Sequence, residues 1–463
     1  AQQYLPDLME KEAEVFGQRT ISGFLSQVGA EEAMQGDQVV WSEQSRLHLS
    51  YTGTVIAAGG TSGSFTVISD IDGHADDEEG FNVELHGIRV NDIVLLASAG
   101  IVVRARVSVV TGAVINVESY ETAALTTLST TASKTRILVV GSEYAKGQSY
   151  YKIDGTTETD SRGANEPIFK SYSNKPIIMK DYYEVSGSDT ARVGWIEVTS
   201  ETGDSGYMWY LKAEADTRAR FNDYLEMAML ESEKTLAAST IGPVPGTIAS
   251  DHGTTAGTQG LFDAIETRGN ITSGVTGVNA ATDLAEFDAI LAEFDKQGAI
   301  EENMMFVNRN VSLAMDDMLA SMNSYGAGGT SYGVFDNSED MALNLGFSGF
   351  RRGSYDFYKS DFKYLNDKAT RGGINDFAGS EAIRGVIIPA GTSSVYDQQL
   401  GKNLKRPFLH VRYRASETDN RRMKSWVTGS VGAATSALDA MQIHMLSERC
   451  LITQGANNFM IMK

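Results

Sequence analysis

The chain has 463 residues, enough for about three domains of ordinary size. It carries 39 lysines and arginines against 60 aspartates and glutamates. The resulting net charge of −21 argues against a protein that grips nucleic acid over its whole surface, although a local basic patch is compatible with it. With 42% hydrophobic and 21% charged residues, the composition is that of a folded globular protein rather than a disordered one.

Cys450 is the one cysteine of the sequence, which excludes an intramolecular disulfide and any site built from several cysteines. It lies in an apolar stretch, so we expect a small buried side chain rather than a reactive thiol. The N-terminus does not have the cationic and then apolar pattern of a signal peptide. The longest apolar run, residues 93–103, is shorter than the roughly 20 residues that cross a bilayer, so no membrane is expected and the cytoplasm is the default compartment.

Residues 1–45 have the character of an N-terminal arm, because glycines interrupt their apolar positions and limit any long helix. From 46 to 150 the pattern changes to a period of two, clearest from Val103 to Val109, which predicts strands with one buried face. Thr111-Gly112 separates that strand from the next one, as in a compact hairpin. An all-β module, either a sandwich or a barrel, is expected from this strand and from further short ones at 47–56, 64–69, 92–97, 113–118 and 136–140.

A long two-stranded hairpin is predicted within residues 151–205. Strands at 176–185 and 190–198 would flank a turn at 186–189 and reach about 30 Å. Because an isolated two-stranded hairpin is only marginally stable in water, it would need a surface to lie on.

Residues 206–235 are the strongest predicted helix, since they contain neither proline nor internal glycine and are rich in Ala, Leu, Met, Glu, Lys and Arg. Such a helix is about 45 Å long and would serve as the axis of a domain. Thr282 and either Asn308 or Asn310 are candidate N-caps. Later elements are predicted as helices at 282–297 and 311–322 and strands at 304–307, 407–414 and 450–462.

The sequence contains partial matches to catalytic and metal-binding motifs, but each of them lacks a feature that its motif requires. Residues 329–333 match the G-x-S-x-G nucleophile elbow, but a glycine-rich loop precedes them where the elbow needs a core strand. The acidic stretch 70–79 resembles a calcium loop, yet Ala75 and Phe81 stand where glycine and glutamate are required. The six histidines show no metal-ligand spacing. We therefore expect no catalytic, metal or cofactor site and no enzyme; a hydrolase with a dispersed site is the alternative.

Positive charge gathers late in this acidic chain. An acidic surface of a neighbouring subunit is the favoured partner, because a charge of −21 would otherwise oppose self-association. Contact with nucleic acid and an ordinary solvated face are the other interpretations. The cations concerned are Arg351, Arg352, Lys402, Lys405, Arg406, Arg412, Arg414, Arg421, Arg422 and Lys424.

The order of these elements resembles the Hong Kong 97-type major capsid proteins of tailed bacteriophages. Residues 175–198 look like the family's extended E-loop and 207–235 like its spine helix. Residues 304–322 resemble the strand and helix that enter its axial domain, and 345–360 the return through that domain. The β module is extra to the minimal fold, and no Lys/Asn pair suggests the covalent cross-links that some members form.

The resemblance implies an α+β fold of the Hong Kong 97 type with an inserted all-β module. Its expected segments are the N-terminal arm (1–45), the inserted β module (46–150), the E-loop hairpin and its base (151–205), the spine helix and peripheral domain (206–325), the axial domain (326–400), and the return through axial and peripheral domains to the C-terminal strand (401–463).

The function implied by the resemblance is a major capsid protein that self-assembles into an icosahedral head and encloses double-stranded DNA. Its partners would be other copies in hexamers and pentamers, portal, scaffold and decoration proteins, and packaged DNA held without sequence-specific binding. The protein would assemble in the host cytoplasm and reside in the virion. An encapsulin-type compartment is the alternative shell. Subunit contacts are expected at Ile177, Met179, Tyr182, Trp195, Arg412, Arg414, Arg421 and Arg422.

Overall fold

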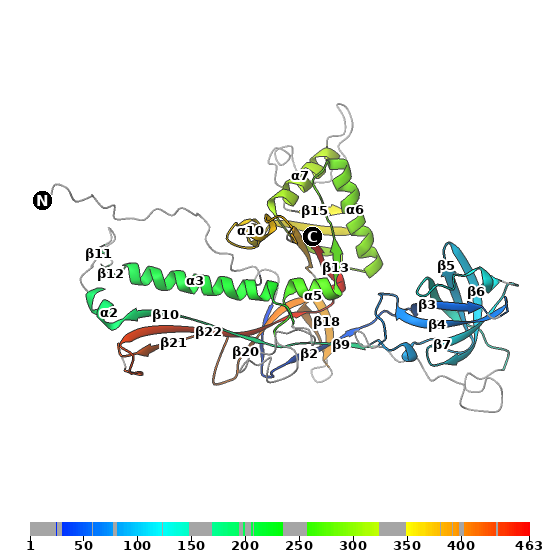
Figure 1. The fold of residues 1–463 in the computed structure, drawn as a ribbon, viewed down its shortest axis with the longest axis horizontal. Helices are drawn as coiled ribbons and strands as arrows, with labels where there is room; N and C mark the ends of the chain where they lie inside the picture. Colours follow the sequence, from blue (N-terminus) through cyan, green and yellow to red (C-terminus); the bar gives the residue numbers. More distant parts are fainter. Residues whose placement is uncertain are drawn as a thin grey trace. The chain divides into compact units, whose positions relative to one another are not determined.

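The computed structural model describes residue 25 and residues 30–57, 59–76, 81–122, 124–147, 169–193, 198–199, 205–206, 208–234, 257–323, 349–379, 381–390, 392–397, 402–431 and 434–463. The chain forms two compact units, one of residues 40–173 and one of residues 1–39 with 174–463 (Figure 1). Over this described part of the chain, no helix is long and apolar enough to span a membrane.

A closed six-stranded barrel forms the core of the unit 40–173, in the order β3-β4-β7-β6-β5-β8. The period of two predicted from Val103 to Val109 is confirmed as far as Val107, because Val103, Ala105 and Val107 all point into the barrel core. It is wrong at Val109, which is 47% exposed after a shift in the register between β6 and β7. Because the sheet is closed, the β module is a barrel and not a sandwich. The strands are β3 (Ser50–Ala57), β4 (Ser62–Asp70), β5 (Asp92–Ser98), β6 (Ile101–Thr111), β7 (Val114–Ser119) and β8 (Thr135–Ser142), with 3-10 turns at η2 (Val83–Leu85) and η3 (Ala124–Thr127).

Two glycines make the barrel geometry possible. Gly112 turns the chain between β6 and β7 with a φ of 54°, a left-handed conformation that favours glycine, as the Thr111-Gly112 signal predicts. At Gly53 a Cβ atom would lie 2.0 Å from the carbonyl oxygen of Thr66, so no larger residue fits where the register of β3 and β4 shifts.

The unit extends beyond the expected module of 46–150 because β2 (Val39–Gln44) pairs with β9 (Phe169–Asn174). Trp41 and Tyr172 place their ring centroids 6.2 Å apart within this pair. The two strands precede and follow the barrel in the sequence, so the barrel is an insertion between them.

A polar cluster connects β9 to the end of β4. Lys170 Nζ lies 3.1 Å from Asp70 Oδ2, and His74 approaches the same carboxylate through its backbone N–H and its Nδ1, both at 2.8 Å. Burial alone would raise the pKa of Asp70, but the hydrogen bonds from His74 and Lys170 outweigh it and hold that pKa well below its usual range. Asp70, the first residue of the calcium-like stretch, therefore holds strands together, and the described residues contain no group of three that could bind a metal ion.

We predict that Asp70→Asn lowers the free energy of unfolding of this unit by about 1.5–3 kcal/mol at pH 7, the range for hydrogen bonds to a charged group. Because the folded-state pKa is depressed, this contribution is present above the unfolded value near 3.9 and is lost as the pH falls through the folded value. The difference between variant and unmodified chain should therefore shrink below about pH 4. Hydrogen exchange of barrel peptides measures it.

Asp72→Asn is the matched control, because the pair of Asp72 with Arg46 is more exposed and should contribute only about 0–1 kcal/mol. Equal losses in the two variants, or a loss at Asp70 that does not depend on pH, would contradict the assignment.

The second unit contains a five-stranded sheet built on one long central strand, β22 (Ala440–Thr453). All of β10 (Ile177–Ser186) pairs antiparallel with β22, from Ile177 opposite Arg449 to Ser186 opposite Ala440. The other edge of β22 is shared by β20 (Leu409–Arg414) and β21 (Lys424–Gly429), and β1 (Ala30–Met34) adds to β20 in parallel.

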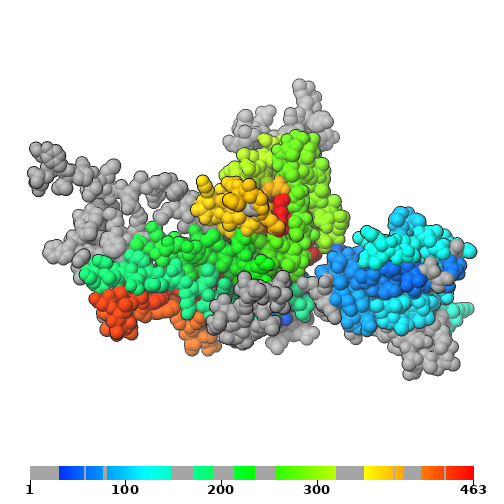
Figure 2. Space-filling model, viewed as in Figure 1, coloured from blue at the N-terminus to red at the C-terminus, as the bar shows by residue number. Residues whose placement is uncertain are grey.

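The predicted long helix is confirmed as α3 (Met208–Glu231), although it ends at residue 231 rather than 235 and residue 206 belongs to a strand. It lies along β10 and β22 (Figure 1). Phe221 and Leu225 of α3 pack against Met445 of β22 and Met179 of β10. Figure 2 shows green residues of this helix region directly beside the red residues of the C-terminal strands.

The predicted hairpin at 176–198 is wrong. Its first strand is β10, but the chain then enters α2 (Gly187–Val193) instead of returning as a strand. Ser186 begins this helix, because its Oγ accepts the N–H of Asp189 at 3.1 Å, a capping contact in place of the expected turn. β22 supplies the backbone partners that the second hairpin strand was expected to give.

The same unit contains a six-stranded mixed sheet, in the order β13-β23-β17-β14-β16-β15. Met305 and Val307 of β14 face a core made with α6 and α7, while Phe306 faces a second core made with α5 and the end of α3. The elements are β13 (Asn270–Thr272), β14 (Glu302–Val307), β15 (Gly349–Arg352), β16 (Tyr355–Asp361), β17 (Gly385–Pro389), β23 (Met460–Met462), α5 (Leu261–Arg268), α6 (Ala280–Gln297), α7 (Arg309–Asn323), α9 (Lys363–Asn366) and α10 (Arg371–Asn375).

The structure identifies the residues that cap the two predicted helices α6 and α7. Asn279, and not Thr282, caps α6, since its side chain accepts the N–H of Thr282. Asn308 caps α7 by accepting the N–H of Val311 at 2.9 Å.

The predicted terminal strand at 450–462 is interrupted, because η5 (Ala456–Asn458) separates β22 from β23 in the other sheet. The predicted strand at 407–414 begins two residues later as β20. The described residues also contain three short strand pairs: β11 (Val198–Thr199) with β12 (Ser205–Gly206), β18 (Thr392–Asp397) with β19 (Lys402–Pro407), and β2 with β9.

Candidate functional site: an arginine cluster at the N-terminal strand

The site lies where β1 joins the edge of β20. The parallel register sets Glu32 opposite Arg412 and Met34 opposite Arg414. Leu25, just before β1, is buried in a core cluster and its N–H donates to Glu226 of α3 at 3.3 Å. Leu25 and β1 of the N-terminal arm are thus attached to the helix and the sheet of their own unit.

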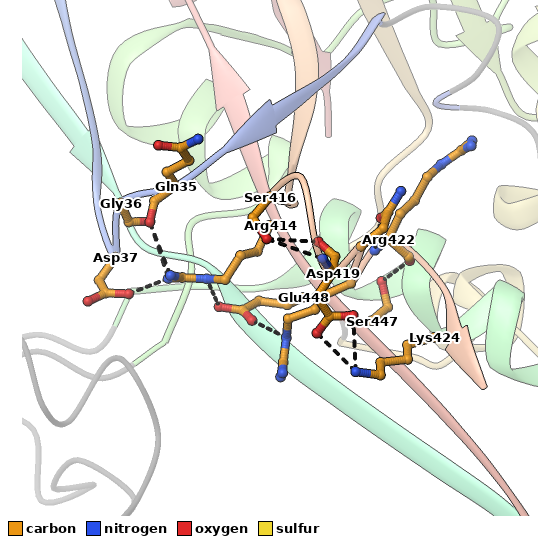
Figure 3. Close-up of polar contacts among 12 residues, drawn as sticks. Gln35, Gly36, Asp37, Arg414, Ser416, Asp419, Arg422, Lys424, Ser447 and Glu448 are labelled. Atoms are coloured by element: carbon orange, nitrogen blue, oxygen red, sulfur yellow. Dashed lines mark hydrogen bonds and ion pairs between the residues drawn. The ribbon is translucent and has the colours of Figure 1, made fainter. Parts of the chain in front are cut away.

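Glu448 of β22 is the buried centre of the cluster, with a side chain that is only 2% exposed. Arg414 donates from Nε to Glu448 Oε1 at 2.7 Å (Figure 3). Arg421 Nε lies 2.6 Å from Glu448 Oε2. The Nε–H of Arg421 is not directed at that oxygen, so this second contact is an ion pair without a hydrogen bond. Two guanidinium groups compensate the charge of one buried carboxylate, which a buried ion needs.

Arg414 also reaches the turn that follows β1. It pairs with Asp37 and donates to the carbonyl oxygens of Gln35 at 3.1 Å and Gly36 at 3.2 Å (Figure 3). Burial would lower the pKa of Arg414, but hydrogen bonds to Asp37 and Glu448 outweigh it and raise the pKa. A single side chain therefore connects the centre of the sheet to the N-terminal segment.

Two further pairs run along β1. Arg412 lies 3.2 Å from Glu32, and Arg422 lies 2.5 Å from Glu31. The guanidinium carbon of Arg422 is also 5.9 Å from the ring centroid of Tyr413. An acidic N-terminal strand therefore lies against a basic surface made by the C-terminal part of the same chain.

Sequence analysis missed the buried half of this cluster. Arg449 is 9% exposed and donates to Ser447 Oγ at 2.9 Å and to the carbonyl oxygen of Arg422 at 3.1 Å; burial lowers its pKa. Its neighbours Ser447 and Glu448 are 0% and 1% exposed. Residues 447–449 are the one run of three consecutive polar residues in β22, and this run is a signal that the sequence carries.

The structure brings together Arg412, Arg414, Arg421 and Arg422, and it pairs each of them with a carboxylate of the same chain. The expected contact residues of β10 do not join them. Ile177 and Met179 pack partly buried against core clusters, while Tyr182 is 56% exposed and stacks on His444 at 5.9 Å.

Several expectations fall outside the described residues: Trp195, the G-x-S-x-G motif at 329–333 and the acidic residues 77–79. Cys450, opposite Arg412 on β22, is fully buried, and burial raises the pKa of its thiol to about 12. The predicted burial of Cys450 is therefore confirmed.

No protein-family model and no curated protein matches the chain. Solved structures that are similar include one of Mycobacterium phage Ogopogo, with 9% identity and a TM-score of 0.43 over 99% of this chain and 97% of that one. The capsid structure of cyanophage P-SCSP1u has 7% identity and a TM-score of 0.38 over 99% of this chain and 92% of that one. The capsid of a native GTA particle has 9% identity and a TM-score of 0.36 over 99% of this chain and 95% of that one. Because these TM-scores lie below 0.5, a function has to be supported by the chain's own elements and contacts.

We predict that Glu448→Gln lowers the free energy of unfolding by about 3 kcal/mol, the lower end of the cost of breaking a buried ion pair, because Arg414 and Arg421 keep partial contact with water. Urea unfolding of the unassembled chain measures this loss. Hydrogen exchange in β1 should rise at the same time.

Arg422→Gln is the control. Its pair with Glu31 has side chains that are 54% and 31% exposed, so we expect a loss of only about 0–1 kcal/mol. The assignment of Glu448 as the centre would fail if the two variants lost the same stability.

Proposed function

We propose that the chain is a Hong Kong 97-type major capsid protein that self-assembles into the icosahedral head of a tailed bacteriophage and encloses double-stranded DNA. The observation that supports this proposal is the arrangement in the larger unit: α3 lies along the extended β10–β22 pair, and a helix-covered mixed sheet follows in the sequence. The resemblance drawn from the sequence assigns these parts to the spine helix with its peripheral sheet and to the axial domain.

The correspondence needs one change. β10 belongs to the sheet under α3 and does not form the E-loop hairpin. We propose instead that the β2–β9 pair, whose second strand immediately precedes β10 in the sequence, takes the E-loop position and that the barrel is inserted into it. The entry to the axial domain then corresponds to β14 and α7, and the return to β15 and β16.

The charge distribution supports enclosure of DNA without adhesion. Four arginines of the late basic cluster, Arg412, Arg414, Arg421 and Arg422, are paired with carboxylates of their own chain, and the net charge of −21 leaves the protein anionic. An anionic wall repels DNA and allows it to be packed without sticking. Portal, scaffold and decoration proteins, assembly in the host cytoplasm and residence in the virion are parts of the same proposal.

Tyr182 is the expected contact residue of β10 best placed for a neighbouring subunit. Its ring, with His444 and the 37% exposed Trp426, forms a stacked row across β10, β22 and β21. Lys180 and Glu184 are exposed on the same face, two residues to either side of Tyr182. The four arginines would contribute indirectly, by holding β1 in place at the edge of the sheet.

We predict that the purified full-length chain forms closed shells by electron microscopy and that these shells contain nuclease-protected DNA when they are produced with the packaging partners. Shells that hold only protein cargo would instead support an encapsulin-type compartment. A monodisperse monomer under all assembly conditions would contradict both.

A further inference from the structure

The outer surface of the barrel is not uniform, and one side of it is apolar. The outward positions of β8, β5 and β6 form adjacent rows, with Leu138 opposite Leu95 and Arg136 opposite Ala97. Val102 continues the row of Ala97 on β6, and Val140 lies at the register shift between Ile93 and Val94. We call this surface the β5 face; its apolar members are Ile93, Leu95, Ala97, Val102, Leu138 and Val140.

These apolar side chains are accessible. Val140 is 61%, Val102 57% and Leu138 39% exposed, and the outward residues of β5 between them are partly exposed. On the opposite side of the barrel, most outward positions of β3, β4 and β7 are hydroxyl or amide side chains such as Thr54, Thr66 and Asn116. Ile56 and Val114 are exposed there, but each lies opposite a polar residue of β4. The β5 face differs because its aliphatic residues are contiguous across three strands, which marks an interaction surface.

Three arginines surround this centre. Arg104 is paired across the strands with Leu95, Arg106 with Ile93 and Arg136 with Ala97. Arg106 already contacts Glu118 of β7 at 3.0 Å. Arg104 and Arg136 are exposed, and no carboxylate among the described residues lies within ion-pair distance of either.

We infer that the β5 face is a docking surface for a second copy of this chain, with Arg104 and Arg136 meeting carboxylates of that copy around the aliphatic centre. Charge complementarity supports this occupant, because a copy with 60 acidic against 39 basic residues offers a mainly anionic surface. An apolar centre rimmed by arginine is also the composition of protein interfaces. Single-stranded nucleic acid would instead call for aromatic side chains on which bases stack, and this centre is aliphatic.

The inference rests on the proposed function, since a shell supplies the neighbouring copy, and it adds the face and the chemistry of the contact. The test uses the full-length chain with Val140→Cys, labelled with a benzophenone maleimide and irradiated after assembly. The native Cys450 is buried and does not take the label, so the probe reports on position 140. Asn116→Cys, exposed on the opposite side of the barrel, is the matched control.

We expect chain-to-chain products from position 140 in yield more than about tenfold above those from position 116. Arg104→Glu with Arg136→Glu should lower that yield by a similar factor, because facing like charges oppose docking. Lys134→Glu, an exposed change of the same sign outside the face, should leave it unchanged. Circular dichroism verifies that each variant is folded.

If shells form but positions 116 and 140 give equal yields, or the double arginine variant keeps its yield, the inference is overturned and the proposed function is not. Products with nucleic acid or with another protein would show a different occupant and overturn it as well. If the unmodified chain forms no shells, the proposed function fails; products from position 140 in solution then still report whether the face pairs with a second copy.

Discussion

The pairing of β10 with β22 is the constraint on which the larger unit depends. Every residue of β10 has a partner on β22, and the free edge of β22 then receives β20 and β21 in succession. The apolar face that this ladder creates is covered by Phe221 and Leu225 of α3. Helix, sheet and N-terminal strand all take their positions from one long strand near the C-terminus.

Both units hold a distant segment with the same device, a shielded carboxylate shared by two cationic or hydrogen-bonding groups. In the barrel unit, Asp70 accepts contacts from His74 and from Lys170, which is 100 residues away. In the larger unit, Glu448 holds Arg414, which in turn reaches Asp37 across 377 residues. A buried charge without its partner is costly, so each cluster penalises any arrangement in which the distant segment is displaced.

The elements that the sequence predicts correctly are those that depend on local patterns. Alternation along Val103–Val107 needs no knowledge of the partner strand, and a glycine at position 112 signals its own turn. The helix α3 was visible in the same way, through propensity and the absence of breakers. Distant partners were not visible. Ser186 is compatible with a turn or with a helix cap, and only the presence of β22 beside β10 decides between them.

The arginine cluster shows the same limit. The sequence shows the concentration of cations, and its negative overall charge favours carboxylate partners on another subunit. The partners lie at Glu31, Glu32, Asp37 and Glu448, three of them at the opposite end of the chain. The position of a residue in the sequence does not show which distant residues lie near it. The polar triplet 447–449, which is buried in the structure, is the sequence feature that indicates the place of the cluster.

The place of β1 has a consequence for the way the chain is made. An uncovered strand such as β20 would offer its backbone groups to any other extended segment, and newly made copies would be at risk of joining edge to edge. β1 occupies that edge. Residues 30–34 leave the ribosome before residues 409–414, so the strand that closes the edge is always synthesised before the edge itself exists.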